Sequence, residues 1–268
     1  MSGFAAEWLA LREPYDARAR NPDILEAAVR SLAGHPSVTI VDLACGTGST
    51  LRALSPRLTG QQNWRMVDND LGLLARAAAD APVGVNVLPV ALDLNRDLEA
   101  ALDGAVDLVT TSALLDLVSD AWLERLVVEI AAREIPLYAA LTYDGRIECD
   151  PADGGDATIV ASVNRHQRGD KGFGPALGPA AASAVIARFE AVGYSVARGG
   201  ADWLFGPNDR PMQTETLTGW AAAAHEAGDQ PHADIAGWLA RRRDAVAAGR
   251  SSIRVGHVDI FARPTGKR

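Results

Sequence analysis

A run of apolar residues that ends in a glycine turn constrains this chain more than any other feature. Residues 38–43 are β-branched or apolar except for one acid, Asp42. Gly46 and Gly48 follow at once, and a stretch that can start a helix comes next. A strand, a tight turn and a helix N-terminus in this order are typical of the first unit of a nucleotide-binding α/β sheet.

The spacing of the glycines narrows the kind of nucleotide. The phosphate-binding pattern G-x-x-x-x-G-K-[ST] is absent. The dinucleotide pattern G-x-G-x-x-G also fails: with Gly46 and Gly48 as the first two glycines the third falls on Leu51, and with Gly46 as the second the first falls on Ala44. What remains, D-L-A-C-G-T-G over residues 42–48, resembles the first motif of class I S-adenosylmethionine (SAM) dependent methyltransferases.

Two acids farther along the chain strengthen this resemblance. Asp68 ends a second predicted strand, where a carboxylate can accept hydrogen bonds from the hydroxyls of a ribose. Asp93 follows a third predicted strand, and the resemblance implies that it contacts the adenine amino group. Each acid alone could be a helix cap, so the prediction depends on their order along the chain.

The resemblance implies a role for each position near these motifs. Asp42 would face the methionine ammonium, directly or through water, and the two glycines would let the backbone approach the cofactor. Tyr15 and Arg20 are predicted contacts from an N-terminal segment that either covers the cofactor or forms a solvated amphipathic helix. The predicted cofactor-binding residues are Asp42, Ala44, Gly46, Gly48, Asp68, Asn69, Asp93, Leu94, Ser112, Ala113, Tyr15 and Arg20.

Strand-like and helix-like patterns alternate from residue 24 to about residue 143, which predicts a parallel sheet with helices on both faces. By resemblance the fold is a doubly wound α/β fold, with a mostly parallel seven-stranded sheet and an antiparallel C-terminal strand. Residues 1–35 are predicted to form an N-terminal helical cap. Residues 36–268 are predicted to form the SAM-binding domain, with substrate-side insertions at about 144–180 and 206–250. Residues 144–180 are rich in Gly, Asp and Pro and predict a long irregular excursion.

The composition excludes several classes of protein. Of the 268 residues 48% are hydrophobic, which excludes a disordered chain, and the net charge of −8 disfavours nucleic acid or an anionic membrane as a partner. Cys45 and Cys149 lie in unrelated contexts, so we expect a reduced, cytoplasmic protein without a disulfide framework. No signal sequence, membrane span or metal-binding spacing is evident, and the oligomeric state stays open.

The sequence indicates the residues that would bind the methyl acceptor less clearly than those that would bind the cofactor. Methyl transfer needs mainly alignment and a dry site, and the family has no universal catalytic residue. His166 is the predicted general base, and Arg165, Arg168 and Lys171 are predicted to hold an anionic acceptor. The alternative is a solvated basic loop. Asp116 is predicted to lie on the acceptor side or to cap a helix, and no metal is expected.

We therefore expect a SAM-dependent methyltransferase that acts on a small, anionic molecule and releases S-adenosylhomocysteine (SAH). An NAD-type oxidoreductase with a degenerate glycine turn is the first alternative, although its third glycine is missing. A binding protein that keeps a SAM pocket without transferring the methyl group is the second, because the fold needs no fixed catalytic residue.

Overall fold

The computed structural model describes residues 5–266, so residues 1–4 and 267–268 of the two predicted segments lie outside the described part. The strands are β1 (Ser37–Leu43), β2 (Gln61–Asp68), β3 (Val85–Ala91), β4 (Leu108–Ser112), β5 (Leu137–Asp150), β6 (Tyr194–Gly200), β7 (Trp203–Phe205) and β8 (Ser252–Pro264). The α-helices are α1 (Ala6–Ala19), α2 (Pro22–Ser31), α3 (Ser49–Leu54), α4 (Leu71–Ala79), α5 (Leu98–Ala101), α6 (Asp120–Ala132), α7 (Asp156–His166), α8 (Ala181–Ala191), α9 (Arg210–Ala227) and α10 (His232–Ala247).

The strands form one sheet in the order β3-β2-β1-β4-β5-β8-β6, and the short β7 also pairs with β8. Strands β1 to β5 run parallel, whereas β8 is antiparallel to both β5 and β6. The expected mostly parallel sheet with an antiparallel C-terminal strand is therefore confirmed, with β7 as an addition. The strand order reverses between β1 and β4, and in open α/β sheets ligands bind beside the carboxyl ends of strands at such a point.

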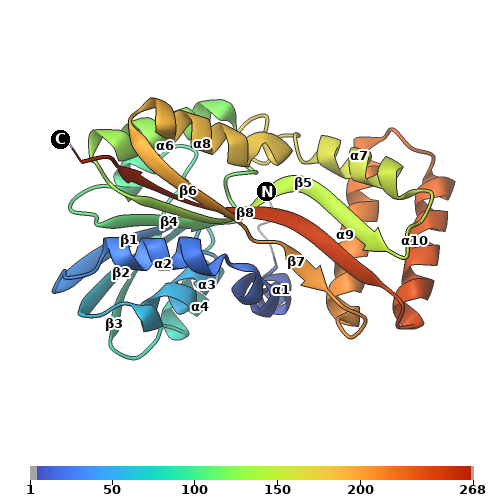
Figure 1. Ribbon diagram of the computed structural model, residues 1–268, viewed down its shortest axis with the longest axis horizontal. Helices are drawn as coiled ribbons and strands as arrows, with labels where there is room; N and C mark the ends of the chain where they lie inside the picture. The colour runs from blue at the N-terminus through green and yellow to red at the C-terminus, as the bar shows by residue number, and fades with distance from the viewer. Residues whose placement is uncertain (1–4, 267–268) are drawn as a thin grey trace.

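Helices cover both faces of this sheet (Figure 1). Because side chains alternate along a strand, Val41 and Leu43 pack with α6 and α8, whereas Ile40 packs with α2, α3 and α4 on the opposite face. Each fully buried side chain of this kind stabilises the fold by about 1.5–3 kcal/mol. Two apolar layers thus fix the sheet edge at which Asp42 and the glycine turn lie.

Two strands of the same sheet extend into a second lobe. Strands β5 and β8 continue beyond the parallel strands, and α7, α9, α10 and β7 pack around their extensions at the right of Figure 1. Its core includes Phe205, Met212, Leu217 and Trp238. The long strands therefore connect the two lobes directly.

The prediction of an irregular excursion over residues 144–180 was wrong for its first half. Strand β5 continues to Asp150, and α7 follows from Asp156 to His166. Ile147 and Cys149 pack towards the lobe core while the alternate residues face solvent, so a polar-looking sequence forms a half-buried strand. In α7, Ile159 and Val163 are four residues apart and share the buried face.

The inward face of α1 is charged. The buried residues of α1 are Arg12 and Asp16, and the buried Arg20 follows one turn later as its C-cap. These positions are spaced four residues apart, so they line one side of the helix. A helix that buries charges normally does so against polar partners, because an unpaired buried charge is costly. We therefore expect a polar site beneath α1.

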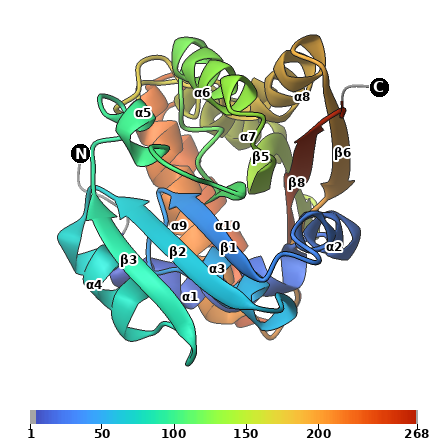
Figure 2. The same cartoon turned by 90° about the vertical axis from the view of Figure 1, so that its left-hand side faces the viewer.

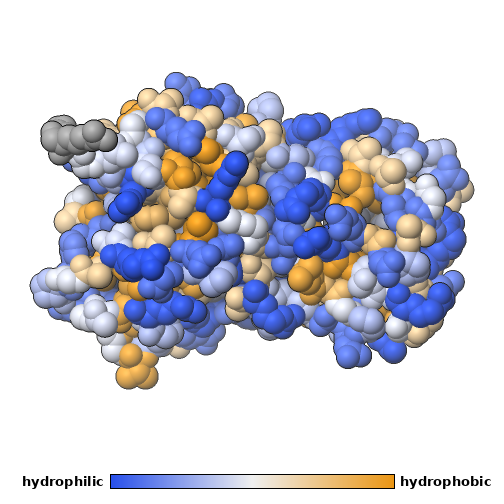
Figure 3. All heavy atoms as spheres, viewed as in Figure 1, coloured by the Kyte–Doolittle hydropathy of each residue, from blue (hydrophilic) through white to orange (hydrophobic). Residues whose placement is uncertain are grey.

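The face of the molecule in Figure 3 is largely hydrophilic, with apolar residues interspersed among polar ones. Large apolar side chains that are exposed, such as Leu71, Leu88 and Leu204, belong to different elements. Within residues 5–266, no helix combines the length and the apolar character that a bilayer span would need.

Candidate active site

The glycine turn after β1 has a backbone that few residue types can adopt. Gly46 and Gly48 have φ of 54° and 86°, in the left-handed region that favours glycine. Ala44, at the position of the motif's first glycine, also has a positive φ of 51°. The Cys45 N–H donates to the Val67 carbonyl at 3.0 Å, which ties the turn to β2. The turn thus exposes backbone at the reversal point of the sheet.

A buried pair of opposite charges lies beside this turn. The Thr110 hydroxyl donates to Oδ1 of Asp42 at 2.7 Å, while Oδ2 of Asp42 has no hydrogen-bond partner within the described chain. Burial raises the pKa of Asp42 to about 7, and the positive charge of Arg20 opposes that rise. Within residues 5–266, Arg20 donates only to hydroxyl oxygens, those of Thr50 at 3.1 Å, Tyr138 at 3.4 Å and Ser112 at 3.5 Å. Both groups therefore retain capacity for a charged ligand.

The next two predicted acids lie at the ends of β2 and β3. Asp68 accepts the Gly46 N–H at 2.9 Å through Oδ2 and the Asp70 N–H at 3.0 Å through Oδ1, so the carboxylate is held against the glycine turn. Asp93 is exposed and accepts the Asn95 N–H at 3.0 Å. Side-chain oxygens with free lone pairs thus line the same edge of the sheet.

The other predicted cofactor residues follow the same strands. Asn69 is exposed directly after Asp68, and Leu94 is buried while its carbonyl accepts the Trp122 Nε1–H at 2.7 Å. Ser112 ends β4 beside Arg20, and Ala113 follows it with a positive φ of 53°. These positions agree with the expected arrangement, and their contacts with a cofactor stay a prediction.

Helix α1 is fastened over the glycine turn at one end. Both Nε and Nη2 of Arg52 donate to the Glu13 carboxylate, at 2.6 and 2.7 Å, and Nη1 donates to the Thr47 carbonyl at 2.6 Å. A Cβ at Gly46 would lie 3.4 Å from Leu9 of α1. The sequence did not reveal the Glu13–Arg52 pair, because the two residues belong to separate elements.

Tyr15 fastens α1 to the second lobe. Its hydroxyl donates to Asp209 at 2.9 Å, and its ring meets Phe205 edge-on, with the ring centroids 5.1 Å apart. The predicted contact of Tyr15 with the cofactor remains untested, and the contacts in the structure connect α1 with β7 and the start of α9. Helix α1 therefore contacts both lobes.

Asp116 lies in the turn after β4 and is buried, and its Oδ1 has no hydrogen-bond partner in residues 5–266. Ser119, not Asp116, caps α6, because the Ser119 hydroxyl accepts the Trp122 N–H at 3.2 Å. The reading of Asp116 as a helix cap is thus wrong. Burial raises the pKa of Asp116 to about 6.

The predicted basic segment, residues 165–171, lies on the second lobe, where nearby carboxylates contact several of its basic side chains. Nε2 of His166 lies 2.9 Å from Glu226, and Nζ of Lys171 lies 3.3 Å from Nδ1 of His166. Arg165 pairs with Asp229 at 3.0 Å, and Arg168 is exposed. The structure connects this segment with α9 and the turn after it. The roles predicted for His166, Arg165, Arg168 and Lys171 remain predictions.

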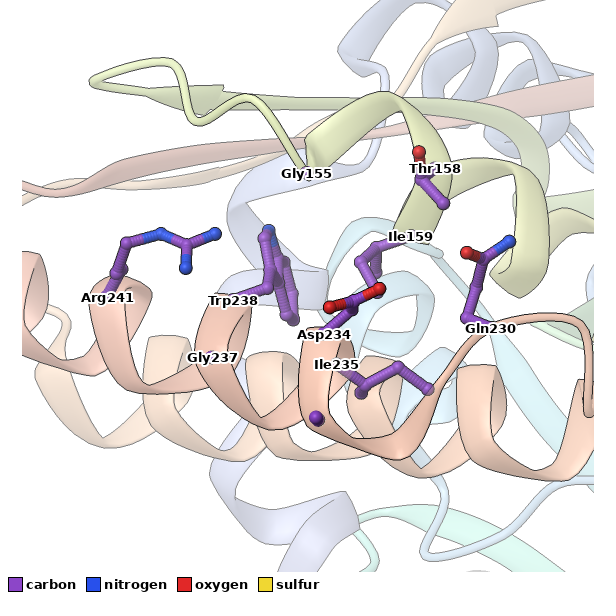
Figure 4. A pocket seen from close by; sticks show the side chains of 10 residues that line it. Gly155, Thr158, Ile159, Gln230, Asp234, Ile235, Gly237, Trp238 and Arg241 are labelled. Atoms are coloured by element: carbon purple, nitrogen blue, oxygen red, sulfur yellow. The ribbon is translucent and has the colours of Figure 1, made fainter.

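A hollow of about 330 Å³ lies elsewhere in the second lobe, between α7 and α10 (Figure 4). Ile159, Ile235 and Trp238 line it together with the polar residues Gln230 and Asp234. None of the predicted site residues lines this hollow. The described residues also contain no group of three or more His, Cys, Asp or Glu side chains placed to hold a metal.

Comparison with known proteins agrees with this architecture. Residues 40–133 match a family model described as a methyltransferase domain. A search of curated proteins found no match.

Among solved structures, YcgJ from Bacillus subtilis is 14% identical with a TM-score of 0.51, over 92% of this chain and 100% of that one. The cyclopropane synthase MmaA2 from Mycobacterium tuberculosis is 13% identical with a TM-score of 0.49, over 89% of this chain and 82% of that one. A SAM-dependent methyltransferase from Geobacter sulfurreducens, in complex with SAH, is 14% identical with a TM-score of 0.47, over 98% and 100%.

At these identities the likeness to YcgJ concerns the fold alone. The family model covers the glycine turn and the strands that carry Asp68, Asp93 and Ser112. Residues 40–133 thus match a methyltransferase domain, and the sheet has the Rossmann-like topology of a methyltransferase fold.

Proposed function

We propose that this protein binds SAM at the glycine turn and transfers the methyl group to a small-molecule acceptor, releasing SAH. The observation that carries the proposal is the buried pair of Asp42 and Arg20: Oδ2 of Asp42 has no hydrogen-bond partner in residues 5–266, and Arg20 donates there to hydroxyl oxygens and not to a carboxylate. The methionine part of SAM carries an ammonium and a carboxylate. A buried site with one carboxylate and one guanidinium is complementary to such a zwitterion.

Different residues around the turn would bind different parts of SAM. Oδ2 of Asp42 would accept a hydrogen bond from the ammonium, and Arg20 would donate to the carboxylate in place of its long bonds to hydroxyls. Asp68 would accept the ribose hydroxyls through the remaining lone pairs of its two oxygens. Asp93 would accept the adenine amino group beside Leu94.

Bound SAM supplies a methyl group on a positively charged sulfur, which is already activated for transfer. The protein then contributes orientation and exclusion of water. Helix α1 supplies both, because Glu13 holds it to Arg52 at the turn and its charged face covers the carboxyl ends of β1 and β4. No metal is needed for this step.

The finer prediction of an anionic acceptor depends on the basic segment. Arg165 already pairs with Asp229, and Lys171 and His166 lie beside Glu226, so an anion would compete with these carboxylates. We retain the small-molecule acceptor as the proposal and derive its chemistry below from other residues. A cytoplasmic location is proposed with it, supported by the two unpaired cysteines, Cys45 and Cys149.

Calorimetric titration with SAH tests cofactor binding directly. Binding that weakens at least 10-fold in Asp42→Asn and is retained in Asp80→Asn, at an exposed residue after α4, would support the proposal. Binding of NAD instead of SAH would overturn it.

Transfer needs a separate test, because a protein that only binds SAM would pass the titration. Incubation with SAM labelled in its methyl group and a metabolite extract should yield a labelled product. Binding of SAH without any labelled product would indicate a binding protein and would contradict the proposed transfer.

A further inference from the structure

Two of the buried aspartates differ from the rest. In residues 5–266 the buried aspartates are Asp16, Asp42, Asp68, Asp116 and Asp259. Hydrogen bonds reach both oxygens of Asp16, Asp68 and Asp259, whereas one oxygen of Asp42 and one of Asp116 have no partner within that range. A buried polar atom without a partner destabilises the fold, so it calls for a functional explanation.

Asp42 has such an explanation at the cofactor site, and Asp116 needs a different one. Asp116 follows Ser112 after β4, on the side towards Tyr143 of β5 and away from the glycine turn. The positive charge of Arg12 acts on both Asp116 and His257. Arg12 of α1 and Tyr143 of β5 thus lie near Asp116, and His257 of β8 lies against Tyr143, with the ring centroids 6.0 Å apart.

Helix α1 connects this region with the cofactor site. Arg20 at its C-terminal end contacts Ser112, and Arg12 lies two helical turns earlier on the same face. Eight residues of α-helix span about 12 Å. One face of α1 therefore covers the cofactor's methionine end at Arg20 and a second polar region at Arg12.

The charges of this second region favour an uncharged ligand. Arg12 is already paired with Asp16, through bonds of 2.9 and 3.2 Å, and Trp203 Nε1 also donates to Asp16 at 2.9 Å. Burial lowers the pKa of His257 to about 3, so its ring is neutral at pH 7. One cation, Arg12, thus acts on two carboxylates, Asp16 and Asp116, and the net negative charge would repel a carboxylate or phosphate.

We propose that Asp116 is the general base of the methyl transfer, and that the acceptor is an uncharged molecule that presents an O–H or N–H group to Oδ1 of Asp116. This inference rests on the proposed function, and it assigns the base to Asp116 and not to His166. The acceptor's lone pair forms a bond to the methyl carbon, the carbon–sulfur bond breaks with its electron pair left on sulfur, and the acceptor's proton passes to Asp116. Asp116 then gives this proton to water.

Binding of matched ring compounds tests the acceptor class without relying on turnover. Phenol, aniline and benzoate share one ring and differ in the group that they present. Titrated into protein saturated with SAH, phenol or aniline should bind, and Asp116→Asn should weaken that binding at least 10-fold. Stronger binding of benzoate, or no binding of phenol and aniline, would overturn the proposed acceptor class.

The rate of methylation of the bound probe tests the base. Asp116→Asn should lower kcat at least 100-fold, the usual contribution of a general base, while SAH affinity and the melting temperature stay close to wild type. Asp80→Asn serves as the matched control. A kcat that Asp116→Asn leaves unchanged would refute the base role. Loss of SAH binding in the wild type would instead contradict the proposed function, so the two failures are distinguishable.

Discussion

Replacing Arg20 by Met should weaken cofactor binding. The guanidinium donates to hydroxyl oxygens at 3.1, 3.4 and 3.5 Å, whereas charge-assisted N–H···O bonds are about 2.7–2.9 Å long. Its hydrogen bonds in the ligand-free protein are therefore weak. Two shorter bonds to a carboxylate, at about 1.5 kcal/mol each, would contribute about 3 kcal/mol, or roughly a 100-fold change in Kd.

Met has a similar length and needs no charged partner. We expect Arg20→Met to lower the unfolding free energy as well, because the positive charge of Arg20 acts on the buried carboxylates of Asp42 and Asp259, which the variant would leave without it. Titration calorimetry with SAH and urea unfolding measure the two effects.

Arg65→Met is the matched control. Arg65 donates to the Ala101 and Asp103 carbonyls at 2.9 and 2.8 Å, away from the glycine turn. This variant should keep its SAH affinity. Unchanged SAH affinity in a folded Arg20→Met protein would refute the reasoning.

Three further predictions concern the glycine turn. Burial raises the pKa of Asp42 from 3.8 to about 7, so the folded state binds more protons than the unfolded state between these values. The unfolding free energy should therefore fall as pH rises from about 4 to 7, less steeply in Asp42→Asn, and equal slopes in urea titrations would contradict this. Gly48→Ala should lose about 1–2 kcal/mol, because φ is +86° and the new Cβ would lie 3.4 Å from Ala77 and Met66; an unchanged melting temperature would count against it. Ala44→Gly should keep or raise the melting temperature, because φ is +51° there, and a drop of several degrees would argue against strain at this residue.

The sheet could be predicted from the sequence because its signals are local. The apolar run of residues 38–43 and the glycines that follow define a strand and a turn without reference to distant residues. The extension of β5 could not be predicted in this way. Its outer half becomes a strand by pairing with β8, between Ile147 and Val255 for example, and by packing Ile147 and Cys149 on the second lobe. Pairing with a strand distant in the sequence thus forms a strand that the local sequence pattern does not predict.

The candidate site shows the same contrast between features that a local pattern predicts and features that depend on distant residues. Asp42, Asp68 and Asp93 could be predicted because each lies at or just after the C-terminal end of a strand. Arg12 and the Glu13–Arg52 pair were missed, because charges on a helix normally mark its solvent face. Only the position of α1 over the sheet shows that its charged face is buried. A spacing of four residues between Arg12, Asp16 and Arg20 was the available signal.

The two attachments of α1 bear on the order of events during turnover. One joins Glu13 to Arg52 at the glycine turn, and the other joins Tyr15 to Asp209 on the second lobe. Because one rigid helix makes both, lifting it uncovers the donor and acceptor sites together. Both substrates must then be present before the helix closes, and both products leave after it reopens. We therefore expect sequential kinetics through a ternary complex, with a turnover rate limited by the opening of α1.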